Sequence, residues 1–170
     1  MVIADGFIKS HALENIRELP DEFLSYFVGA PNRLYQGDFD NNPALTGSFT
    51  DTDLTMEGQI SQDFAYRFYK KAVIAAMNMM NQILGTNLKV VENYRTEDAD
   101  LTLVVLGSAV GVIKDVVDYY RASRGWKIGV VRPVLFTPPC YEELAFGLRN
   151  AQVITVLERS AVAHNCLLKK

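Results

Sequence analysis

Residues 99–139 read ADLTLVVLGSAVGVIKDVVDYYRASRGWKIGVVRPVLFTPP, and this stretch decides the fold. A continuous apolar run over residues 101–106 ends at Gly107, a pattern typical of a strand that is buried on both faces. Helical spacing over residues 109–125 and another apolar run over residues 126–136 predict a helix and a second buried strand. The residues expected to face the core from this helix are Val112, Val116 and Tyr119 or Tyr120.

The segments on either side continue the alternation of strands and helices. Residues 140–150 have the pattern of a short amphipathic helix with Leu144 and Leu148 on one face, and residues 151–159 predict a third strand. Residues 87–94 indicate a further strand. Strands that alternate with helices of this length are connected by right-handed crossovers. The sequence therefore predicts an α/β fold, a mostly parallel sheet with flanking helices.

The part of the chain before this sheet is less regular. Apolar residues recur at helical spacing over residues 60–84, and Gly85 follows as a stop signal. Because the apolar surface is wider than one stripe, this helix is expected to pack on two sides. Residues 1–59 have a short β-like start and then many turn residues among aromatic and aliphatic ones. We therefore expect an N-terminal strand and extended arm over 1–59 that packs on a partner domain, followed by a domain over 60–170.

Composition and charge bear on the class of function. The chain has 170 residues, of which 49% are apolar and 22% charged, as in ordinary globular proteins. The net charge is −3 and there is no block of Lys or Arg, which argues against nucleic-acid binding. No apolar run is long enough to span a bilayer, and two cysteines cannot supply a four-thiolate cluster. We expect a cytoplasmic protein that binds neither nucleic acid nor membrane.

The turn after the first buried strand, Gly107-Ser108-Ala109-Val110-Gly111, lies where many α/β proteins bind phosphate. It lacks the second glycine of a dinucleotide-binding fingerprint, and no lysine follows as in a phosphate loop. A tight strand-to-helix turn is therefore the favoured interpretation, and anion binding is the alternative.

Arg132 closes the second buried strand, at an edge where open α/β sheets place ligand contacts. An arginine in this position either contacts a ligand or pairs with a carboxylate. His11 and His164 lack the spacing of a metal site, and no GxSxG elbow supports a catalytic triad, so neither a metal ligand nor a catalytic residue is predicted on this chain.

Four segments follow one another in a characteristic order: ADGFIKSH (4–11), NQILGTNLKVVENY (81–94), EDADLTLVVLGSAVGVIKDVVDYYRASRGWKIGVVRPVLFTP (97–138) and YEELAFGLRNAQVITVLERS (141–160). Together they resemble the 2-oxoacid:ferredoxin oxidoreductases, of which pyruvate:ferredoxin oxidoreductase is the best known. The resemblance is to the α chain, from the end of its first domain through a second domain with the transketolase C-terminal-like fold. Its motifs mark five candidates for contacts with a ligand or another domain: Ser10, His11, Gly107, Ser108 and Arg132.

The resemblance implies a subunit or fragment of a complex that decarboxylates a 2-oxoacid such as pyruvate and passes electrons to ferredoxin. Thiamine diphosphate, Mg²⁺ and [4Fe–4S] clusters belong to the complete complex, and no cofactor is expected on this chain alone. The expected partners are thiamine diphosphate-binding and ferredoxin-like subunits or domains, with ferredoxin as an indirect partner and a homodimer as a further alternative. Because the sequence starts where the family's first α domain ends, we expect it to complete an enzyme in a structural role.

Two rival hypotheses stay open. The chain could be a non-enzymatic α/β module that holds an anionic ligand, such as CoA or a nucleotide, with the glycine turn and strand-end arginines. It could also be a purely structural or dimerisation domain. The apolar arm favours the oxidoreductase subunit, because such an arm needs a partner surface.

Overall fold

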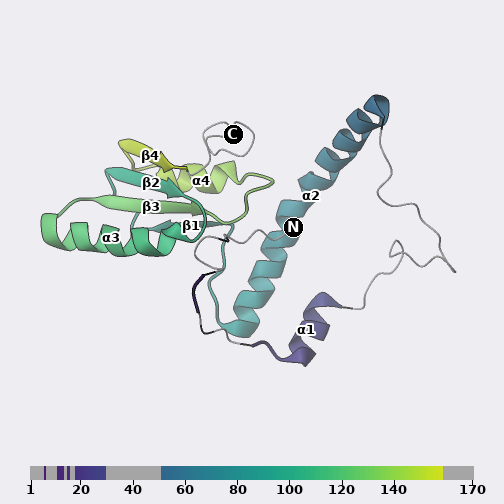
Figure 1. Cartoon of the computed structure of the whole chain (residues 1–170), viewed down its shortest axis with the longest axis horizontal. Coiled ribbons are helices and arrows are strands. Elements are labelled where there is room, and N and C mark those ends of the chain that lie inside the picture. The colour runs from purple at the N-terminus through teal and green to yellow at the C-terminus, as the bar shows by residue number, and fades with distance from the viewer. Residues whose placement is uncertain (1–5, 7–10, 14, 16–17, 30–50, 159–170) are drawn as a thin grey trace. The chain divides into compact units, whose positions relative to one another are not determined.

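The computed structural model describes residues 6, 11–13, 15, 18–29 and 51–158. The described part contains these helices and strands in chain order (Figure 1): α1 Asp21–Val28, α2 Thr52–Leu84, β1 Val91–Tyr94, β2 Leu101–Val105, α3 Ala109–Arg124, β3 Ile128–Pro133, α4 Tyr141–Leu148 and β4 Val153–Leu157. The chain divides into two units, one of residues 12–62 and one of residues 1–11 with 63–170, so that the division falls within α2.

The smaller unit contains α1, a helix of eight residues within the stretch that the sequence predicts to be extended. Asp21 and Glu22 lie in its first turn, where negative carboxylates interact favourably with the positive end of the helix dipole. Gly29 follows the helix at φ 73°, a positive φ that glycine adopts without steric cost. Most of the predicted arm lies outside the described residues.

α2 begins at Thr52, earlier than the predicted start at Ile60. The backbone N–H of Thr52 donates a hydrogen bond of 2.8 Å to Asp51 Oδ1, so an acidic side chain satisfies one free donor at the start of the helix. The helix ends before Gly85, as predicted, and Gly85 has φ 65°. In the described ranges, neither α2 nor any other helix has the length and apolar character needed to cross a membrane.

The larger unit is built on a four-stranded sheet in the order β1-β3-β2-β4. β2 pairs in parallel with both β3 and β4, whereas β1 pairs antiparallel with β3 at one edge. Leu103 in β2 stands opposite Val130 of β3 and Thr155 of β4, which fixes the register. The predicted α/β fold with a mostly parallel sheet and flanking helices is confirmed, and the strand predicted within residues 87–94 is the antiparallel one.

Helices cover the two faces of this sheet (Figure 1). α3 packs on one face over a buried cluster formed by Val105, Val110, Val117, Ile128 and Val130. α4 and the part of α2 in this unit pack on the other face, over Val90, Val91, Val104, Val131 and Cys140. Leu144 and Leu148 of α4 point to this second cluster, as the sequence predicted.

The side of α3 that meets the sheet differs from the predicted one. Tyr120 packs against the core as expected, but Val112 and Val116 are 61% and 44% exposed, and Tyr119 is 66% exposed. The prediction that Val112 and Val116 face inward is therefore wrong. We call Val112, Val116 and Tyr119 the α3 stripe.

Polar contacts with β1 set the rotation of α3. Lys114 forms an ion pair with Glu92, and the hydroxyl of Tyr94 donates a hydrogen bond of 2.6 Å to Asp118 Oδ2. These contacts turn the polar side of α3 toward β1 at one edge of the sheet. The α3 stripe lies on the other side of the helix, away from these contacts.

Candidate functional site

The turn between β2 and α3 depends on one glycine. Gly107 has φ 76°, in the left-handed region that favours glycine, and Ser108 follows at the start of α3. Gly111 already lies inside the helix, and a methyl group added there would meet no atom within 4 Å. Only the first glycine of the motif is therefore needed for the turn, which supports the interpretation of this segment as a tight strand-to-helix turn.

Arg132 in β3 lies opposite Glu92 of β1, and its Nη1 is 3.4 Å from Glu92 Oε2. Lys114 of α3 pairs with the same carboxylate. Burial raises the pKa of Glu92, but the hydrogen bond and charge of Lys114, together with those of Arg132, outweigh burial and hold this pKa below its ordinary value. Arg132 thus pairs with a carboxylate, which is one of the two roles that the sequence left open.

The five residues predicted as contact candidates are only partly brought together. Gly107, Ser108 and Arg132 lie toward the same edge of the sheet, because β2 and β3 are parallel and both end there. His11 is exposed, and Ser10 lies outside the described residues. A contact of any of these five with a ligand or another domain stays a prediction.

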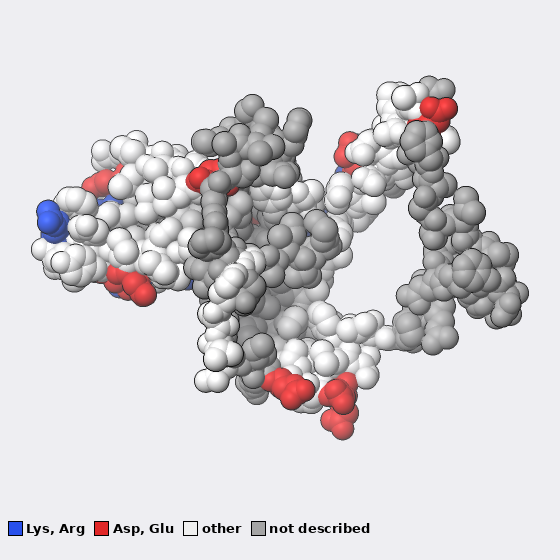
Figure 2. Space-filling model, in the orientation of Figure 1, with Lys and Arg blue, Asp and Glu red and all other residues white. Residues whose placement is uncertain are grey.

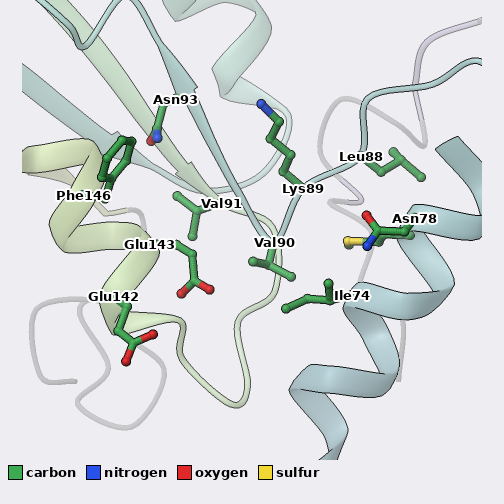
Figure 3. Close-up of a pocket in the computed structure, with 11 residues that line it drawn as sticks. Ile74, Asn78, Leu88, Lys89, Val90, Val91, Asn93, Glu142, Glu143 and Phe146 are labelled. Carbon is green, nitrogen blue, oxygen red and sulfur yellow. The ribbon is translucent and has the colours of Figure 1, made fainter.

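A groove of about 480 Å³ opens between α2, β1 and α4 (Figure 3). Ile74 and Asn78 of α2 lie on one side of it, and Glu143 and Phe146 of α4 lie on the other. The remaining residues of the lining are Met77, Leu88, Lys89, Val90, Val91, Asn93 and Glu142. The groove was not expected from the sequence, because its residues come from three separate segments that share no motif.

The polar groups of this groove differ in how they are satisfied. Glu143 forms an ion pair with Lys70, with 2.8 Å between Glu143 Oε1 and Lys70 Nζ. The hydrogen bond from Lys70 holds the pKa of this carboxyl below its ordinary value. Asn93 Oδ1 is buried without a hydrogen-bond partner among the described residues. The groove therefore combines apolar residues with five polar or charged side chains.

Fewer than half of the described Lys and Arg side chains form ion pairs. Figure 2 shows acidic side chains in separate small groups on the visible face, with few basic ones beside them. The cations that form ion pairs are Lys70, Arg95, Lys114, Arg121 and Arg132. Across the described ranges, no group of three or more His, Cys, Asp or Glu could hold a metal ion. The described residues therefore do not fit Mg²⁺ or an iron–sulfur cluster.

The fold and the turn after β2 define the class of the protein. It is an α/β module with a mostly parallel sheet, and the carboxyl end of β2 is followed by a short glycine turn rather than a phosphate loop. Comparison with known proteins shows which family the chain resembles. Residues 99–169 match the family model described as pyruvate:ferredoxin oxidoreductase core domain II.

Curated relatives match most of the chain. It is 31% identical over 164 residues to pyruvate synthase subunit PorA of Methanothermobacter thermautotrophicus. The matched region covers 94% of this chain and 41% of that protein. It is 33% identical over 160 residues to PorA of Thermotoga maritima, with the same shares covered. Ketoisovalerate oxidoreductase subunit VorA of Pyrococcus horikoshii is 30% identical over 162 residues, again 94% of this chain and 41% of that one. The chain thus spans about two fifths of the length of these relatives.

Among solved structures, a 2-oxoglutarate:ferredoxin oxidoreductase from Magnetococcus marinus is similar with a TM-score of 0.40 and 20% sequence identity. The similarity covers 56% of this chain and 16% of that one. The sequence matches confirm the predicted resemblance: over most of its length the chain is similar to α-type sequences of the 2-oxoacid:ferredoxin oxidoreductases, and residues 99–169 match the model of core domain II.

Proposed function

We propose that the chain contributes an α/β module to a 2-oxoacid:ferredoxin oxidoreductase, which decarboxylates a 2-oxoacid such as pyruvate and passes the electrons to ferredoxin. The observation that carries this proposal is the similarity to PorA over 94% of the chain. Thiamine diphosphate supplies the carbanion chemistry of such an enzyme. The module itself acts in assembly, while partner subunits hold thiamine diphosphate, Mg²⁺ and the [4Fe–4S] clusters. The complex works in the cytoplasm.

Exposed apolar side chains for such an assembly occur on the α3 stripe and on β4. β4 is an edge strand, and Val153 and Leu157 are exposed on the same face of the sheet as α3. Residues 151–157 contain no charged residue, although exposed edge strands are usually protected by charges or proline. Exposed apolar side chains on a helix and on a sheet edge of one module are typical of a protein interface. We call Val112, Val116, Tyr119, Val153 and Leu157 the α3–β4 surface, and we assign it to contact with the partner subunits.

The sheet edge has a secondary place in this proposal. Gly107, Ser108 and Arg132 would meet a neighbouring domain at the carboxyl ends of β2 and β3. Ser10 and His11 would contribute contacts from the N-terminal segment. The pairing of Arg132 with Glu92 supports a domain contact here more than an anion site, because an anion would compete with that carboxylate.

Affinity purification tests the proposed function. A tagged copy of the chain, expressed in its source organism, should co-purify with a thiamine diphosphate-binding subunit and a ferredoxin-like subunit, identified by mass spectrometry. The purified complex should reduce ferredoxin when supplied with a 2-oxoacid and CoA. Recovery of the chain alone, together with unchanged oxidoreductase activity in cells that lack it, would contradict the proposal.

A further inference from the structure

The part of α2 that belongs to the larger unit is attached to the sheet by few contacts. None of its described side chains is buried, whereas α3 buries Val110 and Val117 on the opposite face. From α2, the partly buried Val73, Ile74 and Met77 pack against the buried cluster on their face of the sheet. An element with few buried apolar contacts separates from a fold at a lower free energy than global unfolding requires.

The groove lies beside this part of the helix. Ile74, Met77 and Asn78 form its side toward α2, and its volume is about 480 Å³ (Figure 3). Side chains that line a groove have packing partners on one side only, so they contribute less dispersion energy than side chains in a close-packed contact. The middle of this part of α2 is therefore weakly attached, and its position depends on what holds its two ends.

One end is held by an ion pair between α2 and α4. Lys70 Nζ lies 2.8 Å from Glu143 Oε1, and the two side chains are 28% and 33% exposed. Partly exposed pairs of this kind contribute little stability and are screened by salt. Lys70 lies about 20 Å along the helix from Leu84, where α2 ends.

The other end is closed by the side chain of Asn81. Its Oδ1 accepts a hydrogen bond of 2.7 Å from the backbone N–H of Leu88, and its Nδ2 donates one of 3.0 Å to the carbonyl oxygen of Leu88. The hydroxyl of Thr86 donates to the same Oδ1 at 2.8 Å. Because these bonds fold residues 85–88 back onto the helix, the helix and the turn after it form one body.

The sheet holds the chain again at Val90. Its carbonyl oxygen accepts hydrogen bonds of 2.9 and 3.0 Å from the backbone N–H groups of Val134 and Leu135, and its side chain is 7% exposed. Lys89 is exposed and lies between this residue and Leu88. A backbone rotation that separates α2 from the sheet is therefore confined to Lys89.

We propose that residues 70–88 form a strap, which opens from the sheet as one body about Lys89 while the sheet stays folded, and that the ion pair of Lys70 with Glu143 is the latch that keeps the strap closed. This goes beyond the proposed function, since it concerns a movement within the chain. Opening exposes the apolar face of the sheet around Val91 and Cys140, which the closed strap helps to bury. Access to that face therefore depends on the latch and on ionic strength.

Cys140 reports the open state. Its side chain is 1% exposed and belongs to the cluster against which α2 packs. Burial and the charge of Glu143 raise the pKa of the Cys140 thiol, and the charge of Lys70 opposes this rise. Removal of Lys70 would therefore slow any direct reaction of the closed form, so a faster reaction without Lys70 must come from opening.

Thiol labelling tests the proposal. The full chain carries Cys166→Ser, so that Cys140 is its single cysteine, and reacts with dithiobis-nitrobenzoate over a series of low urea concentrations. The rate of labelling should depend on urea much less steeply than the equilibrium unfolding of the same protein, because local opening exposes little surface. Lys70→Met should accelerate labelling about two- to fivefold. Added salt should accelerate labelling of the chain with Lys70 but not of this variant.

Two further variants locate the movement. Ile74→Ala removes an apolar contact between the strap and the sheet, and it should accelerate labelling about tenfold. Lys114→Met is the matched control for Lys70→Met, because Lys114 and Glu92 form an ion pair of nearly the same exposure, 26% and 35%, on the α3 side of the sheet. It should leave the labelling of Cys140 unchanged.

The outcomes are distinct. Labelling with the same urea dependence as equilibrium unfolding would show that the strap does not open by itself, and this would overturn the proposal. Unchanged labelling in Lys70→Met, or equal acceleration by Lys70→Met and Lys114→Met, would overturn the assignment of the latch. A shallow urea dependence, with acceleration by Lys70→Met and Ile74→Ala alone, supports a strap that opens while the sheet stays folded.

Discussion

Thr102, the second residue of β2, has no exposed surface, and its hydroxyl oxygen has no hydrogen-bond partner among the described residues. A buried polar group without a partner costs roughly 1–3 kcal/mol of desolvation. Thr102→Val removes that hydroxyl and places a methyl group in nearly the same space. We expect the free energy of unfolding to rise by about 1 kcal/mol, which urea denaturation measures as a higher midpoint with an unchanged slope.

Thr102→Ser is the matched control. It keeps the unpaired hydroxyl and removes a buried methyl group, so the free energy of unfolding should fall by about 1 kcal/mol. A loss of stability in Thr102→Val would mean that the hydroxyl has a partner in solution, for example a bound water.

Single residues were predictable from sequence where the reason was local. Gly107 and Gly85 end a strand and a helix as predicted, because a positive φ is a property of the glycine itself. The partner of Arg132 was not predictable, because Glu92 lies forty positions earlier and meets it only across the antiparallel pairing of β1 with β3. The same applies to Thr102, whose unsatisfied hydroxyl depends on the whole sheet around it.

At the scale of elements, the sequence predicted that α3 exists but not how it is rotated. The helix carries two apolar rows, one through Val110 and Val117 and one through Val112 and Val116. Periodicity alone cannot choose between them. The choice is made by the charged side of the helix, which binds β1, and no property of α3 by itself shows where β1 will lie.

Glu92 joins three elements, since this β1 residue pairs with Lys114 of α3 and Arg132 of β3. Its pKa in the folded chain is held below the ordinary value of 4.5, so the carboxylate stabilises the fold at neutral pH. That contribution is complete above about pH 4.5 and is lost as the pH falls through the folded-state pKa. Because the side chain is about one third exposed, we expect Glu92→Gln to cost about 1 kcal/mol at pH 7.

The pH dependence separates this effect from a simple packing defect. Urea denaturation of the wild type and Glu92→Gln at several pH values should give a difference that shrinks toward zero in acid. Glu97→Gln, at an exposed glutamate that follows β1, is the control and should change stability little at any pH. A difference for Glu92→Gln that is the same at pH 7 and at pH 3 would contradict the assigned role.

At the scale of the whole molecule, the sequence predicted the sheet and the family but not the surfaces. The positions of the strands along the chain and their mostly parallel pairing were predictable from hydrophobic runs and short connections, which are local features. The groove between α2, β1 and α4 and the α3–β4 surface each combine residues from segments far apart in the chain. Such surfaces are defined only once the sheet has brought those segments together.

The α3–β4 surface gives the last prediction. Val116 of this surface is 44% exposed, so Val116→Glu should change the stability of the isolated chain by less than about 0.5 kcal/mol. In the complex the new carboxylate would be buried against apolar partner residues without compensation. Recovery of the thiamine diphosphate-binding and ferredoxin-like subunits with the tagged variant should therefore fall at least tenfold, as measured by quantitative mass spectrometry.

Ala122→Glu is the matched control for this variant, since it adds the same carboxylate to α3 at an exposed position outside the α3–β4 surface. The partner subunits should co-purify with this variant in the same amount as with the wild type. Equal recovery with Val116→Glu would show that the partner subunits bind elsewhere on the chain. Reduced recovery with both variants would point to a general effect of negative charge on α3. Only a loss confined to Val116→Glu assigns the contact to this surface, because the two variants have the same net charge and differ in which side of the helix carries it.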